Sequence, residues 1–280
     1  MRKIICLFFF VVLVSSLEGI NCKKILEKIP PEDRLTLCSL FTSLMNDHFA
    51  YTLFGDKPVS LAARFILTPW ENTLEGMQCS GIFWKKWKVW EQYKHLFTLK
   101  NFLLIKEPYK NKNFNISIVL IINKIEFIKT VNVHLSLFES VLERKIIPEE
   151  MLKDIESNKL SFMDSINNNQ MLLGILLGYG KHNSILYNRR ERNYFDCLAF
   201  SGAALKNSSI KLECCGDYSY SPLVIESIHF SADLEHPETK ALEKRYRDLR
   251  GLISAIYAQG DFLEITLSQL VSDEMMLQKF

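Results

Sequence analysis

Two stretches decide the fold of this chain: NFLLIK at residues 101–106 and ISIVLII at residues 116–122. Each is a short apolar run rich in Leu, Ile and Val, and such a run between polar segments predicts a β-strand. The polar segment 108–114 between the two runs predicts a hairpin loop. We therefore expect an antiparallel pair of strands near the middle of the chain.

Outward from this pair, most of the pattern is helical, with apolar residues recurring every three or four positions. Proline and acidic residues open several of these segments, as at Pro30-Pro31-Glu32-Asp33 and His236-Pro237-Glu238. The turn-forming residues 55–58 predict a short hairpin between strands at 49–54 and 59–67, and residues 222–232 alternate enough to predict another strand. Helices are expected at residues 31–46, 82–97, 127–142, from 148 onward, 171–177, 181–194, 237–259 and 261–271.

The strands and helices do not alternate strictly, which indicates an α+β fold dominated by helices, with a small, mainly antiparallel sheet. The chain has 280 residues, 48% of them hydrophobic and 24% charged, and this composition excludes a disordered chain, a collagen and a multi-span membrane protein. Since no linker rich in Gly, Ser or Pro divides the sequence, we expect residues 20–280 to form a single α+β domain. Two lobes that part near residue 145 are the alternative.

The N-terminus has the layout of an export signal. Arg2 and Lys3 precede an apolar run at residues 4–14, and small residues follow at Ser15, Ser16 and Gly19. The run is shorter than the roughly 20 residues that span a bilayer. We expect residues 1–19 to be a signal peptide or an N-terminal anchor, with a buried first helix as the third alternative. The protein is then exported: periplasmic, envelope-associated or secreted.

Cysteine usage is compatible with export but does not require it. Removal of Cys6 with the signal leaves six cysteines, which permit up to three disulfides, although buried thiols fit the wide spacing equally well. Cys22 could carry a lipid, but Asn21 before it is a poor match to a lipoprotein signal. Membrane attachment through the N-terminal segment or Cys22 therefore remains an alternative.

Charge argues against a nucleic-acid partner. Lys and Arg number 34 and Asp and Glu 32, a net charge of +2, and loss of Arg2 and Lys3 with the signal makes the balance 32 to 32. A nucleic-acid-binding protein usually carries a clear basic excess or a basic stripe. We expect an unknown protein or a component of the envelope as partner, and no nucleic acid.

The segment 174–183, GILLGYGKHN, contains three glycines before a lysine and resembles a phosphate-binding loop only superficially. Five residues separate Gly174 from Gly180, where a P-loop has four between its glycines, and His182 replaces the hydroxyl residue that would hold magnesium. A structural role is therefore favoured: Gly178 ends a helix with positive φ, and Gly174 allows close packing of helices.

Metal and nucleophile motifs are not recognisable, and we expect no metal and no cofactor. The six histidines are scattered singly, without the spacing of zinc ligands. Cys79, followed by Ser80 and Gly81, is a candidate nucleophile only if a histidine approaches it in space. Polar residues at helix ends are the best candidates for a binding site. They are Asp47, His48, Lys57, Gly178, Gly180, Lys181 and His182.

Three stretches of the chain resemble uncharacterised exported proteins of chlamydia-like intracellular bacteria. They are DHFAYTLFGDKP at 47–58, LGILLGYGKHN at 173–183 and GDFLEITL at 260–267. The resemblance implies export and assigns no catalytic residue.

Two hypotheses about function follow. The first is an exported, non-enzymatic binding or interaction protein of the cell envelope or the secreted fraction. The second is a secreted hydrolase with Cys79 or His48 in its site, which requires Asp47, His48, Lys57, Lys181 and His182 to converge in one cleft. Whether the protein is an enzyme is left open by the sequence.

Overall fold

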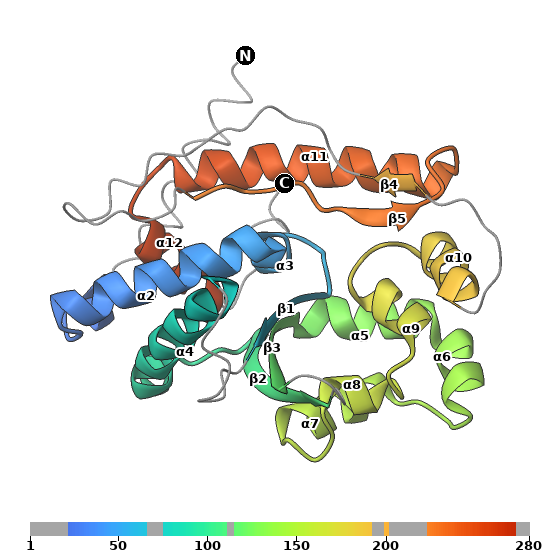
Figure 1. Ribbon diagram of the computed structural model, residues 1–280, viewed down its shortest axis with the longest axis horizontal. Coiled ribbons are helices and arrows are strands. Elements are labelled where there is room, and N and C mark those ends of the chain that lie inside the picture. Colours follow the sequence, from blue (N-terminus) through green and yellow to red (C-terminus); the bar gives the residue numbers. More distant parts are fainter. Residues whose placement is uncertain (1–21, 66–74, 111–114, 192–198, 202–222, 273–280) are drawn as a thin grey trace.

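A three-stranded antiparallel sheet divides the molecule into two cores (Figure 1). The computed structural model describes residues 22–65, 75–110, 115–191, 199–201 and 223–272. The strands are β1 (Val59–Phe65), β2 (Phe102–Lys110) and β3 (Asn115–Asn123), in the order β1-β3-β2. The α+β fold with a small antiparallel sheet is thus the one that the sequence predicts.

The central strand β3 explains why the run at residues 116–122 is apolar throughout. Side chains of a strand alternate between its two faces. Val119 and Ile121 point into one core, and Ile118, Leu120 and Ile122 point into the other. Because helices cover both faces, no position on this part of the strand is left for a polar side chain except Ser117.

The first core is built from the two ends of the described chain. Its helices are α2 (Pro31–Leu44), α3 (Ala50–Phe54), α4 (Glu75–Tyr93), α11 (Pro237–Tyr257) and α12 (Phe262–Val271). The long helix α11 lies along one side of the molecule, over α3 and the sheet (Figure 1). Aromatic rings fill this core, as where Phe41 meets Trp90 edge-on at 5.3 Å.

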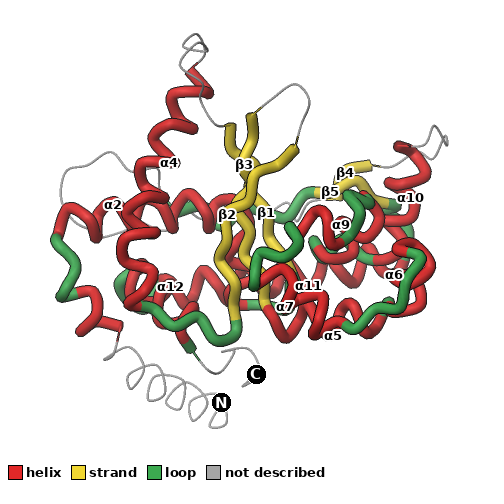
Figure 2. Tube along the Cα trace, turned by 90° about the horizontal axis from the view of Figure 1, so that it is seen from below, coloured by secondary structure: helices red, strands yellow, loops and turns green. Residues whose placement is uncertain are grey.

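The second core belongs to the middle of the chain. Figure 2 shows the strands standing between its helices and the group formed by α2, α4 and α12. The helices are α5 (Lys124–Val133), α6 (Leu135–Leu142), α7 (Pro148–Glu156), α8 (Phe162–Ser165), α9 (Gln170–Leu176) and α10 (Lys181–Glu191). A second, two-stranded sheet of β4 (Ala199–Ser201) and β5 (Phe230–Ala232) lies beside α10.

Several sequence predictions are wrong in detail. Residues 50–54, expected as part of a strand, form the helix α3. The prediction failed because all five side chains are buried, so no alternation of apolar and polar residues distinguishes a strand from a helix there. The expected loop at 108–114 begins later, since Pro108, Tyr109 and Lys110 still pair with β3. Proline is tolerated there because β2 is an edge strand.

Two other expected elements are shorter than the sequence suggests. The helix expected at 127–142 is divided at His134, where φ is −112° and ψ is 20°. The strand expected at 222–232 is regular only at β5, and Leu223, Ile225 and Ile228 instead fill the first core. The helices expected from 237 and at 261–271 are confirmed, with side-chain caps at His236 and Asp261.

The features that bear on export lie partly outside the described residues. These are the segment 1–19, which includes Cys6, and the adjacent Cys214 and Cys215, two of the six cysteines that remain when Cys6 is removed. Cys22 and Cys38 are present as thiols and both are buried, as expected for cysteines that pack as small apolar groups. Burial raises the pKa of the Cys22 thiol. In the part of the chain that is described, no helix has the length and apolarity to cross a bilayer.

Candidate functional site

Asp47 and His48 lie where the helical path from α2 to α3 is broken. The segment η1 (Met45–Phe49) continues α2 as a π-helical turn, but Asp47 has φ −85° and ψ 28°, and His48 has a positive φ of 71°. Asn46 Oδ1 beside them accepts a hydrogen bond from the backbone N–H of Val224 at 3.0 Å. The kink therefore joins the N-terminal helices to the segment that precedes β5.

Lys57 belongs to the same kink and is buried, with an exposed fraction of 2%. Its Nζ donates to the carbonyl of Val59 and, at 3.0 Å, to Ser60 Oγ. Ser60 Oγ in turn donates to the carbonyl of His48 at 2.9 Å and lies 2.8 Å from Thr52 Oγ1. Burial lowers the pKa of Lys57 to about 7, so the amine is close to losing its charge at neutral pH.

His48 is held by the same set of contacts. Its Nε2 lies 3.1 Å from the carbonyl oxygen of Ser227, and since a carbonyl only accepts, this nitrogen carries the hydrogen. Burial, followed by the nearby charge of Lys57, lowers the pKa of His48 to about 4. Tyr51 donates to the carbonyl of Glu226 at 2.7 Å, and the buried Arg250 donates to Ser227 Oγ at 3.1 Å. This network ties the segment at 226–227 to α3 and α11.

The other sequence candidates lie at the turn between α9 and α10. Gly178 and Gly180 have positive φ angles of 76° and 85°. An added Cβ at Gly178 would lie 2.3 Å from the hydroxyl of Tyr246, which donates to the carbonyl of Gly178 at 2.7 Å. One at Gly174 would lie 2.6 Å from Ser184 Oγ. The structural roles that the sequence suggests for Gly174 and Gly178 are therefore confirmed.

Lys181 and His182 begin α10, and an internal carboxylate occupies this helix end. The backbone N–H groups of Lys181 and His182 donate to the carboxylate of Glu238 at 3.0 and 2.8 Å. A negative charge is favourable at the N-terminus of a helix. Glu238 of α11 thus takes the place that a phosphate would occupy in a nucleotide-binding loop.

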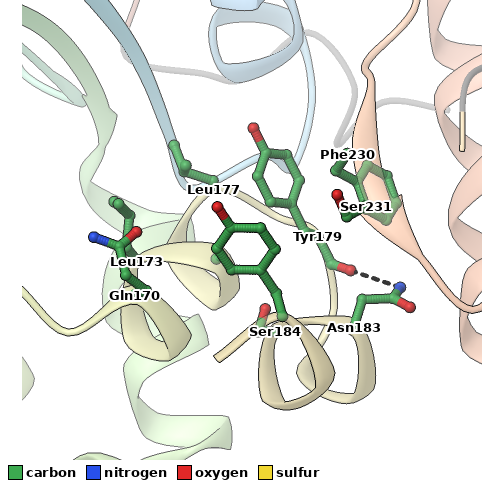
Figure 3. Close-up of a pocket in the computed structure, with 10 residues that line it drawn as sticks. Gln170, Leu173, Leu177, Tyr179, Asn183, Ser184, Phe230 and Ser231 are labelled. Carbon is green, nitrogen blue, oxygen red and sulfur yellow. Dashed lines mark hydrogen bonds between the residues drawn. The ribbon is translucent and has the colours of Figure 1, made fainter. Parts of the chain in front are cut away.

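A pocket of about 320 Å³ opens beside this turn and is mainly apolar and aromatic (Figure 3). Gln170 and Leu173 of α9 lie on one side of it, and Phe230 and Ser231 of β5 lie on the opposite side. The ring of Tyr179 stacks on Phe230 with centroids 4.8 Å apart and planes inclined by 9°. The other lining residues are Gly174, Leu177, Asn183, Ser184 and Tyr187.

The polar groups of Asn183 and Ser184 in this pocket are already used by the fold. Asn183 Nδ2 donates to the carbonyl of Tyr179 at 3.0 Å, and its Oδ1 accepts from the backbone N–H of Asp233 at 3.0 Å. Ser184 donates to the carbonyl of Gly180 at 2.6 Å. Burial raises the pKa of Tyr179 to about 12, so its hydroxyl stays protonated. Gln170, Tyr187 and Ser231 are the other polar side chains of a lining that is otherwise apolar.

A second hollow, of about 210 Å³, lies on the other side of the turn and is lined by charges. Gly178 and Gly180 form part of its floor. The carboxylate of Asp56 pairs with Arg245 at 3.1 Å, and Glu126 pairs with Lys129 at 3.1 Å. Glu238 adds a third carboxylate, so the acidic side chains of this lining outnumber the cationic side chains of Lys129 and Arg245.

The sequence candidates do not meet in one cleft. Lys57 and the turn are close, since its Cγ lies 3.4 Å from where a Cβ of Gly178 would be. However, the polar atoms of His48 and Lys57 are directed into the buried network, whereas Lys181 and His182 lie at the junction of α10 and α11. The convergence that the hydrolase hypothesis requires is therefore not seen. Cys79 lies in α4, and its side chain is outside the described part of the structure.

The pocket contains residues that the sequence analysis did not select. Tyr179 stood inside the candidate segment but was not chosen, and Phe230, Leu173 and Leu177 were missed. Their only sequence signal is apolar character, which they share with the core. In the described ranges, no three His, Cys, Asp or Glu side chains are grouped so that they could hold a metal ion.

Comparison with known proteins does not place the chain in a family. No protein-family model, no curated protein and no solved structure matches it. The evidence for function therefore comes from the site geometry and the N-terminal sequence.

Proposed function

We propose that this chain is an exported, non-enzymatic binding protein, and that the pocket at Tyr179 takes a small, uncharged ligand with a flat apolar ring. The observation that carries the proposal is the stack of Tyr179 on Phe230 in the wall of a 320 Å³ pocket. Pockets that bind small molecules are concave and mainly apolar, with few polar groups, and this one has the size of the smaller members of that class.

Aromatic walls favour an aromatic ligand. A flat ring that enters the pocket would contact the apolar side chains of Leu173 and Leu177 and the rings of Tyr179 and Tyr187. The carbonyl and amide groups of Tyr179 and Asn183 are already hydrogen-bonded to each other, so they offer little to a charged ligand. Burial of a charge without a partner is costly, which favours an uncharged ligand.

The alternative of a secreted hydrolase has less support. The Nε2 of His48 is engaged by the carbonyl of Ser227, and the lowered pKa leaves this imidazole a weak base. The proposed export rests on the pattern of residues 1–19 and on the resemblance to exported proteins of chlamydia-like bacteria. The partner that delivers or receives the ligand, in this proposal, is a protein or another component of the envelope.

The binding proposal is tested with N-phenyl-1-naphthylamine, an uncharged fluorescent probe whose emission rises in apolar surroundings. We expect the purified protein to bind it with a Kd on the order of 10 μM, as the size of the probe allows. Leu173→Trp places a large ring in the pocket and should weaken binding at least tenfold. Leu137→Trp, a partly buried leucine of α6, is the matched control and should bind as the wild type does.

Two results would contradict the proposal: no binding by the wild-type protein at 100 μM probe, or equal binding by Leu173→Trp. Export is tested separately by the intact mass of the protein from a fractionated bacterial host. A soluble periplasmic protein that lacks residues 1–16 or 1–19 supports a cleaved signal. A full-length protein in the cytosol contradicts export, and a full-length or lipid-bearing protein in the membrane favours an anchor.

A further inference from the structure

The N-termini of α10 and α11 meet through two histidine rings. His182 and His236 lie face to face, with centroids 3.6 Å apart and planes inclined by 8°. Glu238 reinforces the contact, because its carboxylate accepts the backbone N–H groups of Lys181 and His182. Two helix ends are thus joined by one ring pair and one carboxylate.

The hydrogen bonds define where the protons lie on the two rings. His182 Nε2 lies 3.2 Å from Asp233 Oδ2, so this nitrogen donates to the carboxylate. His236 Nδ1 accepts from the backbone N–H of Glu238 at 3.3 Å and caps α11, so this nitrogen carries no hydrogen. The observed arrangement therefore accommodates a charge on His182 but requires His236 to be neutral.

Protonation of both rings is incompatible with this arrangement. A proton on Nδ1 of His236 would remove the acceptor that caps α11 and would place two cations 3.6 Å apart. Asp233 and Glu238 contact the pair or its helix ends directly. The charged and titratable groups around them are Glu235 from the loop before α11, Lys240 of α11, Lys181 of α10 and His134 from the junction of α5 and α6.

The negative charges near the pair are already engaged. The hydrogen bond from His182 lowers the pKa of Asp233, and Glu235 pairs with Lys240 at 2.7 Å. Burial, followed by the charge of Lys181, lowers the pKa of His134. This neighbourhood can compensate one added charge on the ring pair more readily than two.

We propose that the His182–His236 stack is an acid-sensitive latch that holds α10 against α11 and thereby keeps the pocket at Tyr179 in its binding shape. The link to the pocket is short. Asp233 accepts from His182 through its side chain and donates to Asn183 through its backbone, and Asn183 donates to the carbonyl of Tyr179. Acidification favours protonation of both imidazoles, which this arrangement cannot accommodate, and so opens the latch.

The effect on ligand binding rests on the proposed function and is measured with the same probe. N-phenyl-1-naphthylamine remains uncharged between pH 7.5 and 5.5. We expect the Kd of the full-length protein to rise about tenfold or more over this range, within the usual size of couplings between sites. His236→Asn keeps a good helix-capping side chain but cannot be protonated, so its Kd should change less than twofold.

His95→Asn is the matched control, because His95 is exposed in the short helix η2 (Lys94–Leu96), and this variant should keep the full pH dependence. The proposal is overturned if the wild-type protein binds the probe equally at pH 7.5 and pH 5.5. It is also overturned if the affinity of His236→Asn for the probe still falls at pH 5.5 as much as that of the wild type.

A measurement without ligand separates the latch from the binding function. NMR titration of the ring C–H groups, assigned with His182→Gln and His236→Asn, should show two separate protonation steps for the pair. The second step should coincide with a fall in the hydrogen-exchange protection of the amides of Lys181 and His182. If the probe does not bind at any pH but these changes occur, the proposed function fails and the latch stands. If both rings become protonated while the amides of Lys181 and His182 keep their hydrogen-exchange protection, the latch is refuted whether or not the probe binds.

Discussion

Two polar clusters lie on the two sides of the turn at residues 178–180. Each contains histidine, but they differ in composition and in burial. Lys57, His48 and Ser60 approach the turn from the side of Gly178, and His182, His236 and Glu238 from the side of Gly180. Lys57 is 2% exposed, whereas the side chain of His182 is 33% exposed and that of Asp233 is 39% exposed. Lys57 and Ser60 of the first cluster are buried and His48 at its edge is partly buried, whereas the second cluster remains in contact with water.

The degree of burial gives the titratable groups of the two clusters different roles. In the buried cluster, burial disfavours the charged forms of Lys57 and His48, so their folded-state pKa values are lowered and their titration changes the stability of the fold. In the exposed cluster, water solvates an added charge, so a small change of pH can move two helix ends apart. The predictions below test whether the first cluster is structural.

The largest effect on the free energy of unfolding is expected from a substitution in the turn at residues 178–180. Gly178→Ala adds a Cβ in a positive-φ position, 2.3 Å from the hydroxyl of Tyr246. Strain and displacement of the Tyr246 hydrogen bond should together lower the free energy of unfolding by about 3 kcal/mol. Urea denaturation measures the change.

A matched glycine separates strain from the general effect of alanine. Gly251 lies within α11 with open space around it, so Gly251→Ala should leave the stability unchanged or raise it by up to about 1 kcal/mol. Tyr246→Phe removes the hydroxyl that the new Cβ meets, and it should recover part of the loss in a double variant. If Gly178→Ala is no less stable than Gly251→Ala, the close approach at the turn is unimportant.

The second effect is a dependence of stability on pH that comes from Lys57. Its pKa is about 7 in the folded protein and near 10.5 when unfolded, so between these values the unfolded chain binds more protons. Stability must then rise with pH in this window, by about 1 kcal/mol per pH unit. We expect a gain of about 2 kcal/mol in the free energy of unfolding from pH 7 to pH 9, which Lys57→Met should abolish.

The control is Lys85→Met, which alters an exposed lysine of α4 and should keep the full rise. Measurements stop at pH 9, because burial raises the pKa of Tyr246 to about 12 and tyrosine ionisation opposes folding at higher pH. A Lys57→Met protein with the same rise as the wild type would show that the amine is not held in the buried network.

Local sequence rules predicted the elements of this fold better than the contacts between them. The strands β2 and β3 and the capped helices α11 and α12 follow from signals that lie within a few residues of each element. The helix α3 escaped prediction because Ala50–Phe54 is buried on all sides, and only its tertiary neighbours distinguish helix from strand there. The division at His134 likewise has no local signal.

The candidate site was predicted only in part, because it too depends on contacts between residues that are far apart in the sequence. Gly178 and Gly180 stand out in the sequence because positive φ angles favour glycine, and both line the charged hollow beside the turn. Phe230 and Leu173 reach the pocket from β5 and α9, far apart in sequence, and nothing local marks them. Lys57 and His48 were selected as polar residues, but burial, which a sequence does not show, makes them structural.

The smallest effect on stability is expected from His48, and it appears at acidic pH. The pKa of His48 is about 4 in the folded protein against 6.5 ordinarily, so the unfolded chain binds more protons between these values. Stability contributed by neutral His48 is present above pH 6.5 and is lost as the pH falls toward 4. Since the ring is not fully buried, this loss should be about 1–2 kcal/mol.

His48→Asn tests this contribution, because asparagine tolerates the positive φ of this position and does not titrate. Carboxylates titrate in both proteins, so the measured quantity is the difference between wild type and variant in the free energy of unfolding. That difference should shrink by about 1–2 kcal/mol from pH 6.5 to pH 4. The exposed His95→Asn should show no such change. A pH-independent difference for His48→Asn would mean that His48 accepts a proton without breaking its contact with Ser227, and the buried cluster would then be as adaptable as the one at His182.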